Sequence, residues 1–201
     1  REKLRKKSHI LLGRYLADQM SEVYSLQQHR KAFCLGNIMP DLRPSFLTTR
    51  HEFFGTFSQL QEKMRELIER NPEENNARVY WRRFGEVMHY MADYFTFPHN
   101  RTYKGSLAEH NSYEAELKNC LKECILSGNA DSQLEEAKYF DSFEELVGYI
   151  RERHACYLES PRCIADDIRF ILRVCYQVIQ GIFQLCLRRQ FHMEGRPVTA
   201  I

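Results

Sequence analysis

The stretch Met88–Asn100 reads MHYMADYFTFPHN and places ionisable groups at fixed positions inside an apolar segment. His89 and Asp93 stand four residues apart, and neighbours such as Met91 and Tyr94 are large and apolar or aromatic. On a helix, side chains four residues apart lie on one face, with about 5–6 Å between Cβ atoms. Because burial of an unpaired charge is costly, a buried imidazole and carboxylate need partners. The stretch therefore predicts a buried helix on which His89 and Asp93 bind a shared partner, and a metal ion is the first candidate.

A second pair with the same spacing follows in EHNSYEAEL, where His110 and Glu114 are again four residues apart on an expected helix. Between the two pairs lies His99, directly after Pro98, where the preceding helix should have ended. One such pair is expected by chance among 8 histidines and 27 acidic residues. Two pairs joined by a histidine at a helix break are less ordinary, and they favour a metal site.

Three further candidates lie upstream of the quoted stretch. His9 lies near the start of the chain, Asp41 lies in GNIMPDL, and His51 lies in RHEF. The complete candidate set has five histidines, three carboxylates and no cysteine: His9, Asp41, His51, His89, Asp93, His99, His110 and Glu114. Nitrogen and oxygen ligands of this kind suit catalytic zinc, or manganese or iron, better than a closed structural zinc site.

The rest of the chain also has helical patterns, with apolar residues at helical spacing and no alternating runs bounded by turns. Ser8 is expected to cap the first helix, and Ser142 with Glu145 predicts a capping box. The segment around Asp41 contains Gly36, Asn37, Pro40 and Pro44 and is expected to be a loop. Helices are expected at about 8–24, 30–35, 56–70, 78–94, 106–126, 141–157 and 164–190. These patterns predict an all-α fold of about seven helices in a single domain over 1–201, with the metal-binding part at about 8–116 and core helices at about 131–190.

Composition excludes several classes of function. The chain has 201 residues, 43% of them hydrophobic, and a net charge of +2, so nucleic acid is an unlikely partner. Seven cysteines without a CxxC motif predict reduced core thiols in a cytoplasmic protein. The uncharged segment Val174–Leu187 is shorter than the roughly 20 residues of a membrane span and is expected to be a core helix. The basic start, REKLRKK, makes a membrane surface a weak candidate partner.

The remaining histidines show no partner pattern. His29, His154 and His192 have no carboxylate at a spacing that would suggest a shared ligand, so we expect them on the surface.

The order and spacing of the candidate ligands resemble the zinc-dependent phospholipase C family of bacteria. The resemblance covers roughly residues 8–116, and it is carried by SHILLG, GNIMPD, RHEF, HYMADYFTFPH and EHNSYEAE. Its most specific part is the spacing His-x3-Asp-x5-His followed by His-x3-Glu. The resemblance implies an all-α fold with clustered metals, a fold that the related single-strand nucleases share.

The resemblance also implies how the ligands are divided. One metal would be held by Asp41, His51, His89 and Asp93, a second by His99, His110 and Glu114, and a third by His9 with Asp93, which would bridge two ions. Secreted members of the family use an amino-terminal Trp at the third metal, whereas the only Trp here is Trp81. We therefore expect two or three zinc ions, with manganese and iron as alternatives.

The function implied by the resemblance is metal-dependent hydrolysis of a phosphoester, with a metal-activated hydroxide attacking phosphorus. Asp41 is the favoured general base, and the substrate is a phospholipid headgroup or a soluble phosphoester. Two alternatives stay open: a nuclease-like phosphodiesterase of the same fold, and a non-catalytic helical module stabilised by metal. An open coordination position would distinguish an enzyme from a structural site.

Overall fold

The computed structural model describes residues 5–42, 52–70, 76–161 and 163–193, without the side chains of residues 5, 6, 192 and 193. These residues form ten α-helices and the short 3-10 helix η2, and they contain no strand, which confirms the all-α prediction. The helices run in the order α1 (Arg5–Gln19), α2 (Tyr24–Gln28), α3 (Arg30–Gly36), α4 (Met39–Leu42), α5 (Phe53–Glu69), α6 (Ala77–Tyr94), η2 (Phe97–His99), α7 (Leu107–Leu126), α8 (Asn129–Gln133), α9 (Phe143–Glu159) and α10 (Ile164–Met193).

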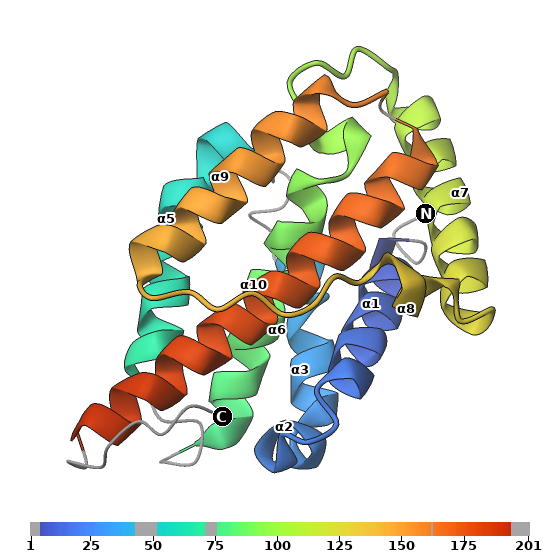
Figure 1. The fold of residues 1–201 in the computed structure, drawn as a ribbon. Helices are drawn as coiled ribbons and strands as arrows, with labels where there is room; N and C mark the ends of the chain where they lie inside the picture. Colours follow the sequence, from blue (N-terminus) through green and yellow to red (C-terminus); the bar gives the residue numbers. More distant parts are fainter. Residues whose placement is uncertain (1–4, 43–51, 71–75, 162, 194–201) are drawn as a thin grey trace.

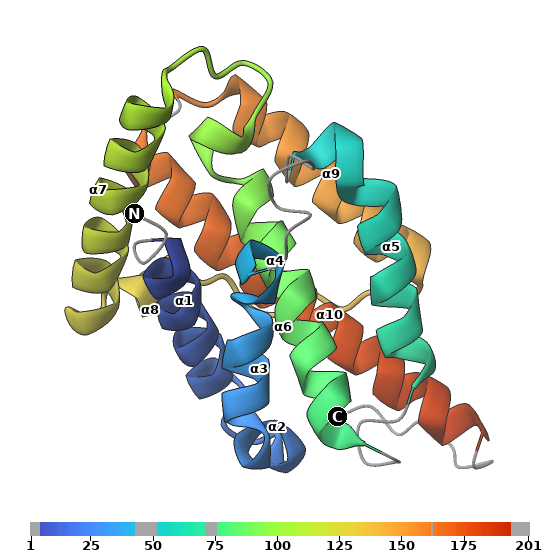
Figure 2. The same ribbon diagram turned by 180° about the vertical axis from the view of Figure 1, so that it is seen from behind.

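Helix α10 crosses one face of the molecule diagonally and packs against α1, α5, α6, α7, α8 and α9 (Figure 1). On the opposite side, α1, α3, α6 and α5 lie side by side, with α4 over α6 (Figure 2). Helix α6 contacts α3, α5 and α10, and its side chains Trp81, Phe84 and Met88 are fully buried. The helix of the quoted stretch is therefore buried in the core, as its apolar residues predicted.

Two glycines allow α3 and α6 to cross in direct backbone contact. A Cβ atom at Gly36 would lie 1.9 Å from the carbonyl oxygen of Arg82, and one at Gly85 would lie 2.1 Å from the carbonyl oxygen of Phe33. Both distances are far below van der Waals contact, so no larger residue fits without moving a helix. The crossing brings Asn37, directly after α3, against α6.

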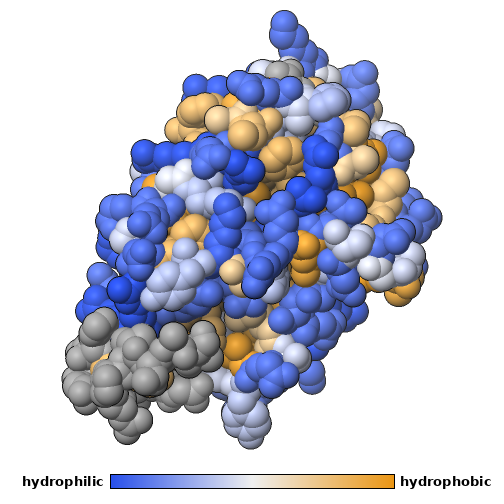
Figure 3. Space-filling view, viewed as in Figure 1, coloured by the Kyte–Doolittle hydropathy of each residue, from blue (hydrophilic) through white to orange (hydrophobic). Residues whose placement is uncertain are grey.

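The carboxy-terminal helix is long and apolar enough, by length and composition, for its segment Ile164–Phe191 to cross a membrane. In the structure, 61% of its most apolar window is buried against other helices. Ile179 and Ile182 are among its fully buried side chains, as the prediction of a core helix requires. The face shown in Figure 3 is mainly hydrophilic, with apolar side chains visible between the charged ones.

Several local predictions were wrong. Ser8 does not cap the first helix, because α1 already begins at Arg5 and the basic residues before Ser8, which favour helix, continue it. The segment around Asp41 is not entirely a loop, since Met39–Leu42 forms one helical turn that accepts Pro40 in its first turn. At the start of α9, Ser142 accepts from the Glu145 N–H as predicted, but the Glu145 carboxylate accepts from the backbone N–H of Asp141.

The seven cysteines are free thiols, but they are not all core residues. Cys175 and Cys186 are buried, three others are partly buried, and Cys156 and Cys163 are exposed. His154 is also not where it was expected: it is 2% exposed and stacks on Phe53 with 3.9 Å between ring centroids. Burial lowers the pKa of His154 to about 4, so this imidazole is neutral at neutral pH.

Candidate metal centre

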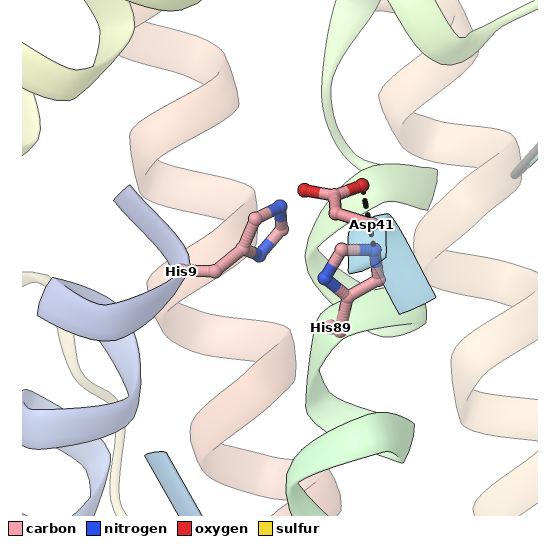
Figure 4. A group of neighbouring side chains, drawn as sticks. All are labelled: His9, Asp41 and His89. Carbon is pink, nitrogen blue, oxygen red and sulfur yellow. Dashed lines mark ion pairs between the residues drawn. The ribbon is translucent and has the colours of Figure 1, made fainter. Parts of the chain in front are cut away.

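The first cluster joins three elements that are far apart in sequence. His9 comes from the first turns of α1, Asp41 from α4 and His89 from the middle of α6, and their ligand atoms all lie within 4.8 Å of one another. Figure 4 shows the His9 and Asp41 side chains directed toward the region beside His89. The two imidazole rings are 4.0 Å apart between centroids, and His89 Nε2 lies 3.7 Å from Asp41 Oδ1.

The backbone of the α3–α4 connection fixes the orientation of His89. Its Nδ1 lies 2.8 Å from the carbonyl oxygen of Asn37, and a carbonyl only accepts, so Nδ1 carries the proton that is donated. The other nitrogen, Nε2, faces Asp41 and also Asp93, whose Oδ2 is 3.2 Å away. Metal-binding histidines are commonly oriented in this way, with one N–H on a backbone carbonyl and the other nitrogen toward the ion.

The second cluster comes from one short region of the chain. His99 of η2 and the pair His110 and Glu114 of α7 place their ligand atoms within 4.8 Å of one another. Glu114 Oε1 lies 2.7 Å from His110 Nε2 and 3.2 Å from His99 Nε2. A complete capping box at Ser106 and Glu109, which was not predicted from the sequence, begins α7 one turn before His110.

Asp93 lies between the two clusters. Its Oδ1 is 3.3 Å from His9 Nε2, and its Oδ2 is 3.2 Å from His89 Nε2 and 3.8 Å from His99 Nδ1. The side chain is 4% exposed. This carboxylate therefore contacts residues of both clusters, whereas the resemblance implied that it would bridge the ion of Asp41 and His89 and a further ion at His9.

Seven of the eight candidate ligands thus lie in one continuous network of contacts, while His51 lies outside the described residues. The division of these ligands among separate ions stays a prediction. His9 contacts Asp93, the residue expected to share its ion, and its ligand atom also lies within 4.8 Å of those of Asp41 and His89.

The chemistry of the donors fits a cation. Within the part of the chain that the structure describes, Asp41 Oδ2 is buried and has no hydrogen-bond partner. A neutral His89 would direct a nitrogen lone pair at the lone pairs of two carboxylates, which is repulsive unless a proton or a cation lies between them. A metal ion would satisfy both His89 Nε2 and the Asp41 carboxylate.

A cavity of about 30 Å³ is lined by residues of both clusters and is large enough for water. His9, Asp93, His99 and Glu114 line its polar side, and Leu12, Leu117, Leu121 and Ile171 are among its apolar lining. The side chains of His9, His99 and His110 are 11–16% exposed, whereas that of His89 is fully buried. Among the described histidines, the centre is therefore closed at His89 and reaches solvent at His9, His99 and His110.

The sequence also matches a known protein family. A family model described as zinc-dependent phospholipase C matches residues 8–164. The chain belongs to the zinc-dependent phospholipase C family. The match includes all eight candidate ligands, and membership supports a metal-dependent, phospholipase-like function and the use of zinc. Comparisons with curated proteins and with solved structures find no significant match.

Two neighbours of the centre were not predicted from the sequence. The carbonyl of Asn37 could not be predicted as a partner of His89, because every residue has a backbone carbonyl. Asp167 of α10 could have been noticed, because it is a carboxylate at a buried position on the apolar face of its helix. Burial raises the pKa of Asp167 to about 6, although three hydrogen bonds oppose that shift.

On the same helix, burial raises the pKa of the Cys175 thiol, and the nearby Asp93 carboxylate adds to the effect. Cys175 is accordingly a neutral core thiol.

Proposed function

We propose that this protein is a zinc-dependent phosphoesterase of the phospholipase C type, acting on a phospholipid headgroup or a soluble phosphoester. The observation that carries the proposal is the arrangement of His9, His89 and His99 around the buried carboxylate of Asp93. Such a dense set of imidazoles and carboxylates is expensive to bury without a cation. When bound, zinc supplies a Lewis acid and a nucleophile at neutral pH.

The residues of the chain have separate roles in this proposal. His9, Asp41, His89 and Asp93 would hold metal on one side, and His99, His110 and Glu114 would hold it on the other, with His51 as a further ligand. Asn37 keeps His89 in the tautomer whose Nε2 is available to metal. The apolar lining from Leu12, Leu117 and Leu121 limits the water that reaches the cavity between the clusters.

Asp41 is the proposed general base. Its Oδ1 lies toward His89, while Oδ2 is buried and without a hydrogen-bond partner among the described residues. A carboxylate with one oxygen on metal can accept a proton from the attacking water on the other oxygen. Catalysis by such a base contributes typically about 100- to 10,000-fold.

The test is hydrolysis by the zinc-loaded protein of short-chain phospholipids, a soluble phosphodiester and single-stranded DNA, each assayed for the released product. We expect turnover of a phospholipid or a soluble phosphoester and a loss of at least about 100-fold in kcat for Asp41→Asn. Asp18→Asn on exposed α1 surface is the matched control and should keep wild-type activity.

The outcomes separate the alternatives. Preferential cleavage of DNA would support a nuclease-like enzyme, and retention of zinc without turnover of any phosphoester would support a metal-stabilised binding module. An Asp41→Asn protein that keeps its metals and full activity would refute the assignment of the base. The cytoplasmic location stays a prediction.

A further inference from the structure

One buried carboxylate outside the metal centre connects the elements that carry the second cluster. Asp167 of α10 is 0% exposed. Its Oδ2 accepts two hydrogen bonds of 2.9 Å, one from the backbone N–H of Phe97 and one from the Tyr113 hydroxyl. Its Oδ1 accepts a 2.6 Å hydrogen bond from the Tyr157 hydroxyl of α9. One side chain therefore joins η2, α7 and α9 to α10.

The partners of Asp167 Oδ2 stand beside the candidate ligands in sequence. Phe97 begins the η2 turn that ends with His99, and Tyr113 directly precedes Glu114 on α7. The two segments are linked through the connection at 100–106, so their relative position depends on tertiary contacts as well. The shared oxygen of Asp167 is such a contact, because it fixes a backbone atom of η2 and a side chain of α7 to the same point.

We propose that Asp167 is a positioning residue for the second metal site, which sets the distance between His99 and the pair His110 and Glu114. The inference rests on the proposed metal centre. Asp167 acts through Phe97 and Tyr113 rather than as a ligand. Residues that orient metal ligands typically change metal affinity about 10- to 100-fold when they are mutated.

The positioning role and a merely structural role make different predictions for two substitutions. Asp167→Ala removes all three hydrogen bonds. In Asp167→Asn, the amide oxygen can accept from Phe97 and Tyr113, and the amide nitrogen can donate to the Tyr157 hydroxyl. If geometry is what Asp167 provides, the Asn variant should retain the second site and the Ala variant should not.

The experiment is a competitive zinc titration of the full-length proteins with a chromophoric chelator, which resolves the affinities of the bound ions. The variant His110→Gln should lose the ion of the second cluster, and His89→Gln should lose that of the first. Each variant therefore identifies which measured affinity belongs to which cluster. We expect Asp167→Ala to weaken the ion that His110→Gln removes by about 10- to 100-fold, to leave the other affinity unchanged, and to be rescued by Asp167→Asn.

Two tyrosine variants provide the matched comparison. Tyr113→Phe removes only the link to α7 and should weaken the same ion, whereas Tyr157→Phe removes only the link to α9 and should not. This pair also keeps the proposal testable if Asp167→Ala fails to fold. Thermal unfolding of each variant measures general destabilisation separately from zinc affinity.

Three results would overturn the inference. These are unchanged affinities in folded Asp167→Ala, unchanged affinities in Tyr113→Phe, and an equal weakening by Tyr113→Phe and Tyr157→Phe. A wild-type protein that binds no zinc would remove the metal centre and this inference together. A protein that binds zinc but cleaves no phosphoester would contradict the proposed function and leave the zinc titration valid.

Discussion

The two clusters of the candidate metal centre are assembled in different ways. The first takes His9, Asp41 and His89 from three helices that lie far apart along the chain. The second takes its three residues from 99–114, a short continuous region. The first cluster therefore depends on how α1, α4 and α6 pack. The second depends on the start of α7, the η2 turn and the hydrogen bonds of Asp167 to both segments. Perturbations at a distance should affect the two clusters separately.

The largest effect is expected from the crossing of α3 and α6, which underlies the first cluster alone. Gly85 lies one turn before His89, and a Cβ atom there would lie 2.1 Å from the Phe33 carbonyl oxygen. Gly85→Ala should push α3 away, loosen the contact between Asn37 and His89, and cost about 3 kcal/mol or more of unfolding free energy. Denaturant unfolding and zinc titration measure the two consequences, and the first cluster should lose more affinity than the second.

Gly148→Ala on α9 is the matched control, because nothing lies within 4 Å of the added Cβ atom. Replacing glycine by alanine in a helix should stabilise the protein by roughly 0.5–1 kcal/mol. If both glycine variants were equally stable, or if Gly85→Ala weakened the second cluster most, the first cluster would not depend on the α3–α6 crossing.

An intermediate effect on the free energy of unfolding is expected from pH. Two buried titratable groups, His154 and Asp167, contact residues that are next to the ligands of the second cluster or close to them in sequence. The pKa of His154, which contacts Asn100 beside His99, is about 4, and that of Asp167 is about 6. Because the pKa of His154 is lower in the folded protein than in the unfolded chain, the unfolded chain binds the proton at a higher pH. His154 therefore lowers the free energy of unfolding as pH falls from 6.5 to 4. The raised pKa of Asp167 acts oppositely: its contribution is full below pH 3.8 and is lost as pH rises through 6. In the wild type the two contributions largely cancel.

Asp167→Asn should expose the contribution of His154. At about 1.4 kcal/mol per pKa unit, the variant should lose up to about 3 kcal/mol more than the wild type between pH 6.5 and pH 4. Denaturant unfolding with a chelator present, at several pH values, measures the difference. Parallel pH profiles for the two proteins would contradict it.

The smallest effect is expected from the helix cap that begins α7. Ser106 Oγ accepts from the Glu109 N–H at 3.3 Å, and Ser106→Ala should cost about 1 kcal/mol of unfolding free energy. The same change at Ser142, which caps α9, should cost a similar amount. Only Ser106→Ala should also weaken zinc binding at the second cluster, by less than Asp167→Ala does. Equal zinc affinities in the two cap variants would show that the start of α7 does not influence the site.

The same difference between local and long-range assembly explains what could be predicted from the sequence. The long helices and the second cluster follow from apolar periodicity and from the spacing of His110 and Glu114. The grouping of His9 with Asp41 and His89 could not be predicted from spacing, because it depends on how α1, α4 and α6 pack. The helices α2, α4 and α8 are only four or five residues long, too short to show a period.

Two buried polar residues were missed although the sequence held a signal for them. His154 stands between Ile150 and Tyr157, and Asp167 between Ile164 and Ile171, so each lies on the apolar face of its helix. A polar side chain at such a position predicts burial with hydrogen-bond partners. Asp167 has three such partners, and His154 contacts Asn100.

The most direct test of the metal centre is zinc content per chain for the wild type and Asp93→Asn, measured by plasma mass spectrometry after zinc loading and desalting. Asp93 is a carboxylate with contacts to both clusters. We predict two or three ions in the wild type, a clear loss in Asp93→Asn, and wild-type content in the surface control Asp18→Asn. No zinc in the wild type, or equal zinc content in all three proteins, would contradict a metal centre bridged by Asp93.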